Sequence, residues 1–210
     1  MMIGELKEDI SDQIDKAVAV LKKGGVVAFP TETSYGLAAL INKSSALEKI
    51  FFIKDRPPTK PLLVLIPNRS FLDDLVTNIS KDARLLMDNF WPGPLTLLFS
   101  AQPGLNKALT ADTGKIGVRI SSNKIAIELC KRCNCAITAT SANLSGKEPC
   151  ISPYEIKRDL IPRGLDFIID YGIVKKTPPS TIVDVSISPP RVVREGAIDI
   201  KKIKEIIRVI

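Results

Sequence analysis

The sequence predicts a mixed α/β (α+β) fold, a single domain over residues 1–210 in which about six helices flank a twisted mixed sheet of about seven or eight strands. Short apolar runs bounded by glycine or proline alternate with segments whose apolar residues recur at the helical period. No internal repeat, low-complexity tract or linker divides the chain. The composition, 45% hydrophobic and 25% charged, is that of an ordinary globular domain.

The first predicted elements are a helix over residues 11–23 and a buried strand over residues 26–29. Apolar residues from Ile14 to Leu21 form one stripe of the helix, and Gly24 lets the chain leave it. The order helix then strand therefore opens the fold.

Polar side chains follow this strand, because two threonines, a serine and Tyr35 come directly after Pro30. Proline cannot donate to a sheet ladder, so the strand ends there. Two interpretations stay open. The segment is either a capped turn with Tyr35 packed, or a lining of hydroxyl groups, Thr33 among them, for a small polar substrate.

A second helix is expected over residues 44–54, capped by one of its first two serines and carrying Lys54 on its last turn. Residues 54–61 then contain three cations and three prolines. Proline keeps Arg56 extended, and cations that are held in place at little entropic cost, Lys60 included, suit a polyphosphate. A solvated basic linker is the alternative.

The middle of the chain contains three predicted strands, over residues 62–66, 95–100 and 116–120. An amphipathic helix over residues 80–90 and a proline-glycine turn over residues 91–94 separate the first two strands. All three strands are mostly apolar and are expected to lie in the core.

Arg119 interrupts the last of these strands with a charge. Strict alternation places Ile116, Val118 and Ile120 on one face, so Arg119 points to the other. If that side is water, the arginine is ordinary; if it is the floor of a cleft, its guanidinium is well matched to a carboxylate.

A strand over residues 135–139 also ends in a polar cluster. The cluster consists of Thr140, Ser141, Asn143, Ser145 and Gly146. Hydroxyl and carboxamide groups at this density bind polar oxygens, while Gly146 permits a tight turn. The alternative is that Ser141 or Asn143 caps a turn or a following helix.

The C-terminal part starts with a capping box, which predicts a helix over residues 152–160. Strands are expected over residues 167–170, 181–186 and 191–194, and a final helix over residues 200–207.

Charge and residue usage limit the chemistry. The net charge of +7 favours anionic partners such as nucleotides or RNA. Histidine is absent, which excludes Ser-His-Asp triads and imidazole metal sites. No apolar run approaches the ~18 residues that span a bilayer, so a cytoplasmic protein without membrane contact is expected.

Three cysteines, Cys130, Cys133 and Cys135, form a C-x2-C-x-C cluster. Cys130 falls on an apolar helical face and Cys135 opens a strand, so their thiols are expected to point in different directions. Packing is the preferred interpretation, with a metal or redox site as the alternative; no metal site is predicted.

Seven motifs together resemble the YrdC-like family of L-threonylcarbamoyladenylate synthases, from about residue 10 to 200. They are Pro30-Thr-Glu-Thr-Ser-Tyr-Gly-Leu37, Lys54-x-Arg56-Pro57, Trp91-Pro-Gly-Pro94, Gly117-Val-Arg119, Thr140-Ser-Ala-Asn-x-Ser-Gly146, Ser180-Thr-Ile-Val-Asp184 and Arg194-x-Gly196. The resemblance implies a YrdC/RibB-like fold with a wide basic cleft. It also implies a nucleotidyltransferase that joins L-threonine, bicarbonate and ATP into threonylcarbamoyl-AMP, the first step of threonylcarbamoyladenosine formation at position 37 of tRNA.

The same resemblance assigns two groups of site residues. ATP would be bound by Lys54, Arg56, Lys60, Ser141, Asn143 and Arg194, with Mg²⁺ arriving on the nucleotide. Threonine would be bound by Thr33, Tyr35, Arg119, Thr138 and Ser180. The chain departs from the family at Lys60, Leu65 and Cys150, where asparagine, histidine and serine are common. The physical expectation is that distant cations and hydroxyl groups meet in a single hollow.

Other function classes fit parts of the pattern. A module that binds double-stranded RNA or tRNA without turnover agrees with the basic charge. A carbamoyl-transfer domain of the hydrogenase-maturation type is less favoured, because such proteins carry cysteine-rich zinc regions that this chain lacks. An enzyme of the first class would pass its product to downstream tRNA threonylcarbamoyl transfer proteins.

Overall fold

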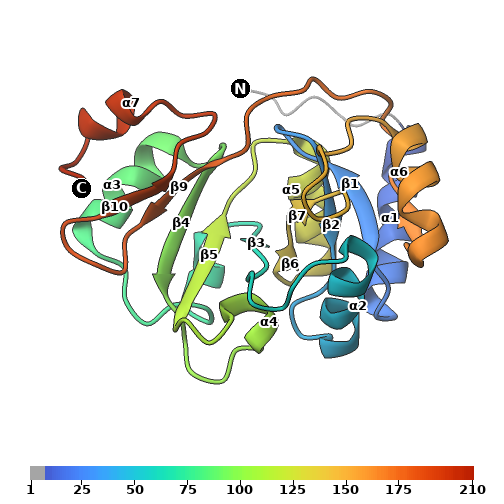
Figure 1. The fold of residues 1–210 in the computed structure, drawn as a ribbon, viewed down its shortest axis with the longest axis horizontal. Helices are drawn as coiled ribbons and strands as arrows, with labels where there is room; N and C mark the ends of the chain where they lie inside the picture. Colours follow the sequence, from blue (N-terminus) through green and yellow to red (C-terminus); the bar gives the residue numbers. More distant parts are fainter. Residues whose placement is uncertain (1–7) are drawn as a thin grey trace.

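The strands form two hydrogen-bonded sheets in the computed structural model, which describes residues 8–210 (Figure 1). The smaller sheet has the order β7-β2-β1-β8 and the larger sheet the order β10-β9-β4-β5-β3-β6. The smaller sheet consists of β1 (Val27–Pro30), β2 (Tyr35–Ala38), β7 (Thr140–Ser141) and β8 (Phe167–Ile168). The larger sheet consists of β3 (Val64–Leu65), β4 (Leu95–Ser100), β5 (Lys115–Arg119), β6 (Ile137–Thr138), β9 (Thr181–Asp184) and β10 (Arg191–Arg194).

Helices flank both sheets. They are α1 (Glu8–Lys22), α2 (Ser44–Lys54), α3 (Lys81–Phe90), α4 (Lys107–Thr110), α5 (Lys124–Cys133), α6 (Pro153–Asp159) and α7 (Ile200–Lys204), with short 3₁₀ turns η1 (Arg69–Leu72) and η2 (Ile161–Arg163). Helices α1 and α5 pack against each other and against β1. Within residues 8–210, no helix combines the length and the apolar character that crossing a bilayer requires.

The pairing confirms the predicted mixed α/β class. In the smaller sheet, β1 runs antiparallel to β2 and parallel to β8. In the larger sheet, β5 runs antiparallel to β4 and parallel to β3. The strands are divided between two sheets rather than forming one continuous sheet.

Ala139 is the point where the chain passes from one sheet to the other. The predicted strand over residues 135–139 is therefore split into β6, which pairs with β3, and β7, which pairs with β2. The Ala139 backbone N–H donates to the Leu63 carbonyl at 2.8 Å, and an isolated bridge joins Leu40 to Ile137. These contacts place the polar cluster after β6 between the sheets.

Other predicted strands are shorter in the structure for local reasons. At the start of the strand predicted over residues 62–66, the Leu62 N–H donates to the Ala108 carbonyl instead of to a strand, at 2.8 Å. The strand predicted over residues 181–186 ends at Asp184, whose carboxylate accepts from the Ser186 N–H at 3.0 Å. Side-chain to backbone hydrogen bonds of this kind compete with a sheet ladder.

Two apolar clusters hold the fold together. The larger cluster combines side chains of both sheets with α2, α3 and α6, so that the two sheets share a core. The smaller cluster fills the space between α1, α5 and the smaller sheet, and it includes Cys130 and Cys133. Burial of this apolar surface is the main force that fixes the sheets next to each other.

Candidate functional site

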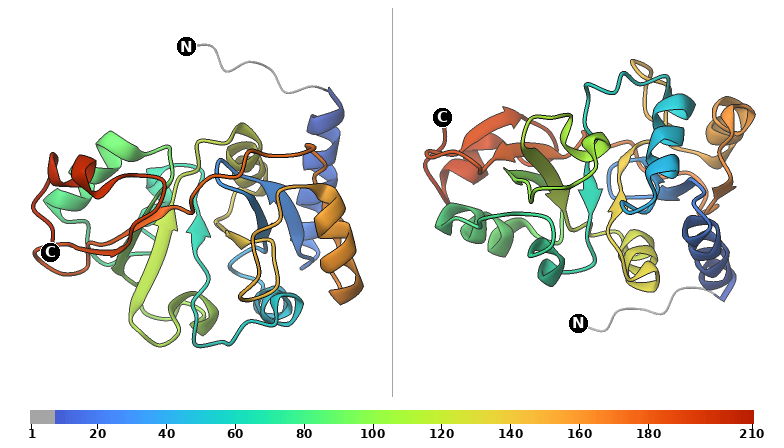
Figure 2. Two further views of the ribbon diagram at one scale, coloured as in Figure 1. Left: turned by 45° about the horizontal axis from the view of Figure 1, so that its top comes forward. Right: turned by 90° about the horizontal axis from the view of Figure 1, so that it is seen from below.

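A cavity of about 730 Å³ lies between the two sheets and receives side chains from both. Residues of β2 and β7 line it from the smaller sheet, and residues of β3, β5 and β10 line it from the larger one. The segment of residues 169–180, called the crossing segment below, runs from β8 to β9 and so from one sheet to the other (Figure 2). Its last five residues also line the cavity.

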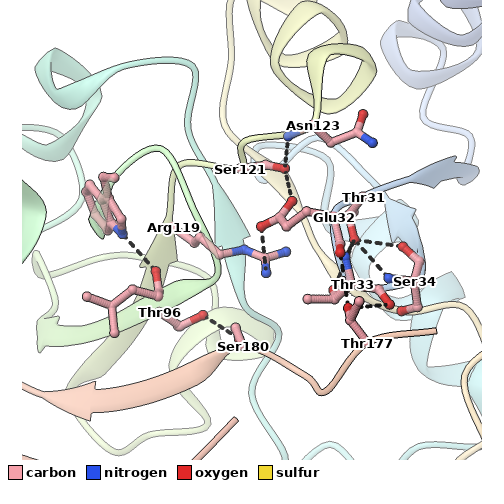
Figure 3. Close-up of polar contacts among 12 residues, drawn as sticks. Thr31, Glu32, Thr33, Ser34, Thr96, Arg119, Ser121, Asn123, Thr177 and Ser180 are labelled. Atoms are coloured by element: carbon pink, nitrogen blue, oxygen red, sulfur yellow. Dashed lines mark hydrogen bonds and ion pairs between the residues drawn. The ribbon is translucent and has the colours of Figure 1, made fainter. Parts of the chain in front are cut away.

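The hydroxyl-rich segment after β1 is both a capped turn and part of the cavity lining, the two alternatives that its sequence left open. The Thr31 hydroxyl donates to the Ser34 carbonyl at 2.7 Å and accepts from the Thr33 N–H at 3.2 Å, which closes the turn (Figure 3). Thr33 and Ser34 also line the cavity. The Thr177 hydroxyl lies within 3.2 Å of the Thr33 carbonyl and 3.1 Å of the Glu32 carbonyl, so the crossing segment is tied to this turn.

Arg119 reaches the cavity from the end of β5 and is the most enclosed cation on its wall, with a side chain only 7% exposed. Its Nη1 lies 3.3 Å from Glu32 Oε1 (Figure 3). The Ser121 hydroxyl donates to Glu32 Oε2, whereas Oε1 has no hydrogen-bond partner among the described residues. Burial lowers the pKa of Arg119, and the Glu32 carboxylate opposes this shift.

The Arg119 guanidinium also makes no well-aligned hydrogen bond within residues 8–210. These N–H groups are therefore free to donate to an anionic group in the cavity. The alternation of β5 thus turns Arg119 away from the core, and the fold places a cavity rather than bulk water on that side.

Arg194 and Ser180 form a second polar group on the larger sheet. Arg194 donates through Nη2 to the Ser180 carbonyl at 2.8 Å and to its hydroxyl at 3.3 Å. The Ser180 hydroxyl is 2.9 Å from that of Thr96, which is fully buried (Figure 3). Gly196 allows this approach, because a Cβ there would lie 2.1 Å from the Pro179 carbonyl oxygen.

Arg56 is held at the cavity by backbone carbonyl groups. Its Nε donates to the Lys60 carbonyl and its Nη2 to the Pro61 carbonyl, each at 3.0 Å. The proline-stiffened segment therefore positions this arginine, as predicted. The prediction for Lys60 is not supported by the geometry, because its side chain is exposed, does not line the cavity, and only its carbonyl takes part.

Ser141 and Asn143 line the cavity, but Lys54 lies beneath them. Lys54 is 1% exposed, and its ammonium donates to the carbonyl groups of Ser141 and Asn143. Burial and the nearby Arg56 lower the pKa of Lys54 to about 7. The expected direct contact between Lys54 and a ligand is therefore corrected, because the loop separates the ammonium from the cavity wall.

The prediction that Thr138 binds threonine is also corrected by the structure. It is fully buried, its hydroxyl donates to the Leu37 carbonyl at 3.0 Å and accepts from the Ala39 N–H at 2.9 Å, and it does not line the cavity. Tyr35 does belong to the lining, but its hydroxyl donates to the Gly172 carbonyl at 2.8 Å. Both hydroxyl groups stabilise the fold.

The expected convergence is present in the structure. The predicted residues that line this cavity are Thr33, Tyr35, Arg56, Arg119, Ser141, Asn143, Ser180 and Arg194. Sequence reasoning missed Lys147, Lys176 and Thr177. The position of Thr177 before two prolines was a usable signal, whereas nothing in the sequence marked the two lysines.

The charge of the cavity wall is strongly positive. Five cationic side chains and one carboxylate line it, and that carboxylate, Glu148, is 3.0 Å from Lys176. Burial and the neighbouring Arg119 lower the pKa of Arg194, so an anion bound between the two guanidinium groups would be favoured electrostatically. Among the described residues no group of three acidic, cysteine or histidine side chains could hold a metal ion, and the four cysteines are free thiols.

Comparison with protein families and curated proteins gives a consistent match. The family model Sua5_yciO_yrdC, described as telomere recombination, matches residues 19–196. A threonylcarbamoyl-AMP synthase of Pyrococcus abyssi is 33% identical over 207 residues, which are 98% of this chain and 61% of that protein. One of Bacillus subtilis is 36% identical over 196 residues, which are 93% of this chain and 56% of that protein. The chain thus spans somewhat over half the length of these two relatives.

Comparison with solved structures agrees. The crystal structure of P. abyssi Sua5 complexed with L-threonine superimposes with a TM-score of 0.89 at 33% identity. The match covers 98% of this chain and 61% of that one.

Proposed function

The chain belongs to the Sua5/YciO/YrdC family, and from this premise we propose that it is an L-threonylcarbamoyladenylate synthase. The reaction would join L-threonine, bicarbonate and ATP into threonylcarbamoyl-AMP and release pyrophosphate. This would be the first step of threonylcarbamoyladenosine formation at position 37 of tRNA. The names of two curated relatives and the threonine complex of the P. abyssi protein support the proposal.

One observation carries the proposal. The buried Arg119 and the exposed Arg194 line one cavity, and each keeps N–H groups that make no hydrogen bond within the part of the chain that the structure describes. Guanidinium groups in such a position bind carboxylate or phosphate in preference to neutral groups. A site of this kind can hold the carboxylate of an amino acid and the phosphates of a nucleotide next to each other.

Threonine would lie on the side of Arg119. Its carboxylate would accept from the Arg119 guanidinium, and its side-chain hydroxyl would find partners in Thr33 and Ser180. Tyr35 would contribute only its position in the wall, because its hydroxyl is already bonded.

ATP would lie on the side of the loop after β7. Arg56 and Arg194 would contact phosphate oxygens, and Ser141 and Asn143 would contact the nucleotide from the loop. About 730 Å³ of cavity volume is within the range of ligand sites of this size.

The chemistry follows from this arrangement. The threonine amine and bicarbonate would give an N-carboxylate, with loss of water. An oxygen of that carboxylate would then attack the α-phosphorus of ATP, and the bond from that phosphorus to the bridging oxygen of pyrophosphate would break. Such a step needs positioning and neutralisation of charge, which Arg56 and Arg194 can supply without a protein nucleophile.

We propose that Mg²⁺ reaches the site on the phosphates of ATP. Within residues 8–210 the protein offers no carboxylate cage of its own, and Glu148, the acidic residue of the wall, is paired with Lys176. Mg²⁺ commonly binds nucleotides in this way, through substrate phosphates and water.

The test is mass spectrometry of the product made from the three substrates. We expect threonylcarbamoyl-AMP and pyrophosphate only when L-threonine, bicarbonate and ATP are all present. No adenylate product, together with salt-sensitive binding of double-stranded RNA, would instead support an RNA-binding module. An active enzyme would act in the cytoplasm and deliver its product to tRNA threonylcarbamoyl transfer proteins. Its basic surface would contact tRNA directly, which a gel-shift experiment at low salt would test.

A further inference from the structure

Lys54 is an enclosed cation that touches the candidate site from behind. It ends α2, and its ammonium donates to three oxygens: the Ser141 carbonyl, the Asn143 carbonyl at 2.9 Å and Asn143 Oδ1 at 3.1 Å. Its own carbonyl accepts from the Ser145 N–H at 2.7 Å. One residue thus holds the loop of residues 141–147, called the site loop below, through both its side chain and its backbone.

The hydrogen bonds inside the site loop leave it dependent on this cation. Asn143 Oδ1 also accepts from the Ser141 hydroxyl at 2.5 Å, and Asn143 Nδ2 donates to the carbonyl groups of Leu144 at 2.9 Å and Lys147 at 2.5 Å. Two carbonyl groups and one carboxamide oxygen therefore converge on the same point. An ammonium has three donors for these three acceptors. Without it the Asn143 carbonyl would lose its partner, the Ser141 carbonyl would keep the Asn143 N–H, and Asn143 Oδ1 would keep the Ser141 hydroxyl.

The position of Lys54 excludes a role as an open phosphate ligand. Its side chain is 1% exposed and does not line the cavity, whereas Ser141 and Asn143 do. The neighbouring residue of the same segment, Arg56, does line the cavity. Of these two cations, two positions apart in the sequence, Arg56 therefore faces the cavity and Lys54 is buried behind its wall.

We propose that Lys54 is a positioning residue that acts on the nucleotide only through the site loop, by holding Ser141 and Asn143 in their places on the cavity wall. This inference rests on the proposed function for the identity of the ligand, because ATP is the nucleotide expected there. It does not rest on it for the order of the loop, which is a property of the protein alone.

The first experiment measures amide hydrogen exchange of the site loop in the protein without nucleotide. We expect Lys54→Met to raise exchange in this loop about tenfold or more, because local opening becomes easier when its ties are lost. Arg56→Met is the matched control: it removes a cation that faces the cavity, and we expect loop exchange to stay at the wild-type rate. Wild-type protection of the loop in the Lys54 variant would overturn the proposal.

The second experiment measures ATP affinity by calorimetry in a double-mutant cycle. We expect Lys54→Met to weaken ATP binding about tenfold or more. This corresponds to the loss of about one hydrogen bond from Ser141 or Asn143 to the charged nucleotide. In a background that already carries Asn143→Ala and Ser141→Ala, we expect Lys54→Met to add less than about twofold, because residues that act as a unit are non-additive. A full, independent loss in that background would mean that Lys54 contacts ATP itself, and would also overturn the proposal.

Lys54→Arg covers the case in which the methionine variant does not fold. Arginine keeps the charge and the N–H donors of Lys54 but has a longer, planar side chain. If Lys54 acts through the site loop, any rise in loop exchange in this variant should be accompanied by a loss of ATP affinity. A loss of ATP affinity with wild-type loop protection would contradict the inference. If the wild-type protein bound no ATP, the proposed function would fail, whereas the exchange measurement would still decide the role of Lys54.

Discussion

Arg119→Met tests the buried guanidinium of the cavity wall, which pairs with the largely enclosed carboxylate of Glu32. The side chains of Arg119 and Glu32 are 7% and 15% exposed, and their charged atoms lie 3.3 Å apart. Removal of the arginine leaves the carboxylate without its counter-ion in a place that water hardly reaches. We expect folding stability to fall by roughly 3–5 kcal/mol, the usual cost of breaking a buried ion pair from one side.

The same change removes the proposed contact with the threonine carboxylate. A charge-assisted hydrogen bond contributes roughly 1.5–3 kcal/mol. This corresponds to an increase of about 10- to 150-fold in the dissociation constant of L-threonine. The two effects can be separated by a double variant, Arg119→Met with Glu32→Gln, which removes both charges and keeps an oxygen for the Ser121 hydroxyl.

We expect the double variant to recover most of the stability but none of the threonine affinity. Urea denaturation would give the stability, and calorimetry with L-threonine would give the affinity. Arg132→Met is the control, because Arg132 pairs with Asp15 and Glu128 on α1 and α5, and does not line the cavity. Threonine affinity of the double variant within about twofold of wild type would refute the assignment of Arg119 as the carboxylate anchor.

Four further variants test other assignments. Thr138→Val should lower stability by about 1–3 kcal/mol, because the Ala39 N–H loses its buried acceptor; a raised threonine dissociation constant at wild-type stability would restore a direct role for Thr138. Burial raises the pKa of Tyr35 to about 12, so the folded state keeps a proton that the unfolded state loses above pH ~10, and wild-type stability should fall as pH rises from ~10 toward ~12. Tyr35→Phe should remove that part of the pH dependence in denaturation curves, and an unchanged curve would contradict it. Arg56→Met should raise the dissociation constant of ATP by about 10- to 150-fold with the fold intact, whereas Lys60→Met should change it less than about twofold. Equal effects of the two variants would contradict the assignment of Arg56, and not Lys60, to the ATP site.

Local signals in the sequence were sufficient for much of the fold. The capping box at Ser152 is present with both of its hydrogen bonds, and the alternation in β5 correctly turned Arg119 away from Ile116 and Val118. These features act between residues a few positions apart, so they can be recognised without knowledge of the tertiary structure.

The sequence by itself determined the order of the elements and the segments that carry the polar chemistry. Only the tertiary structure decided which of those polar groups meet the ligand. Lys54 and Thr138 belong to the right segments but point into protein, since their partners lie 87 to 101 positions away in the chain. Glu32 gained its role in the same way, because it meets Arg119 only after two sheets have packed together. Which face of a strand or helix becomes a cavity wall depends on such long-range packing, and no local pattern contains that information.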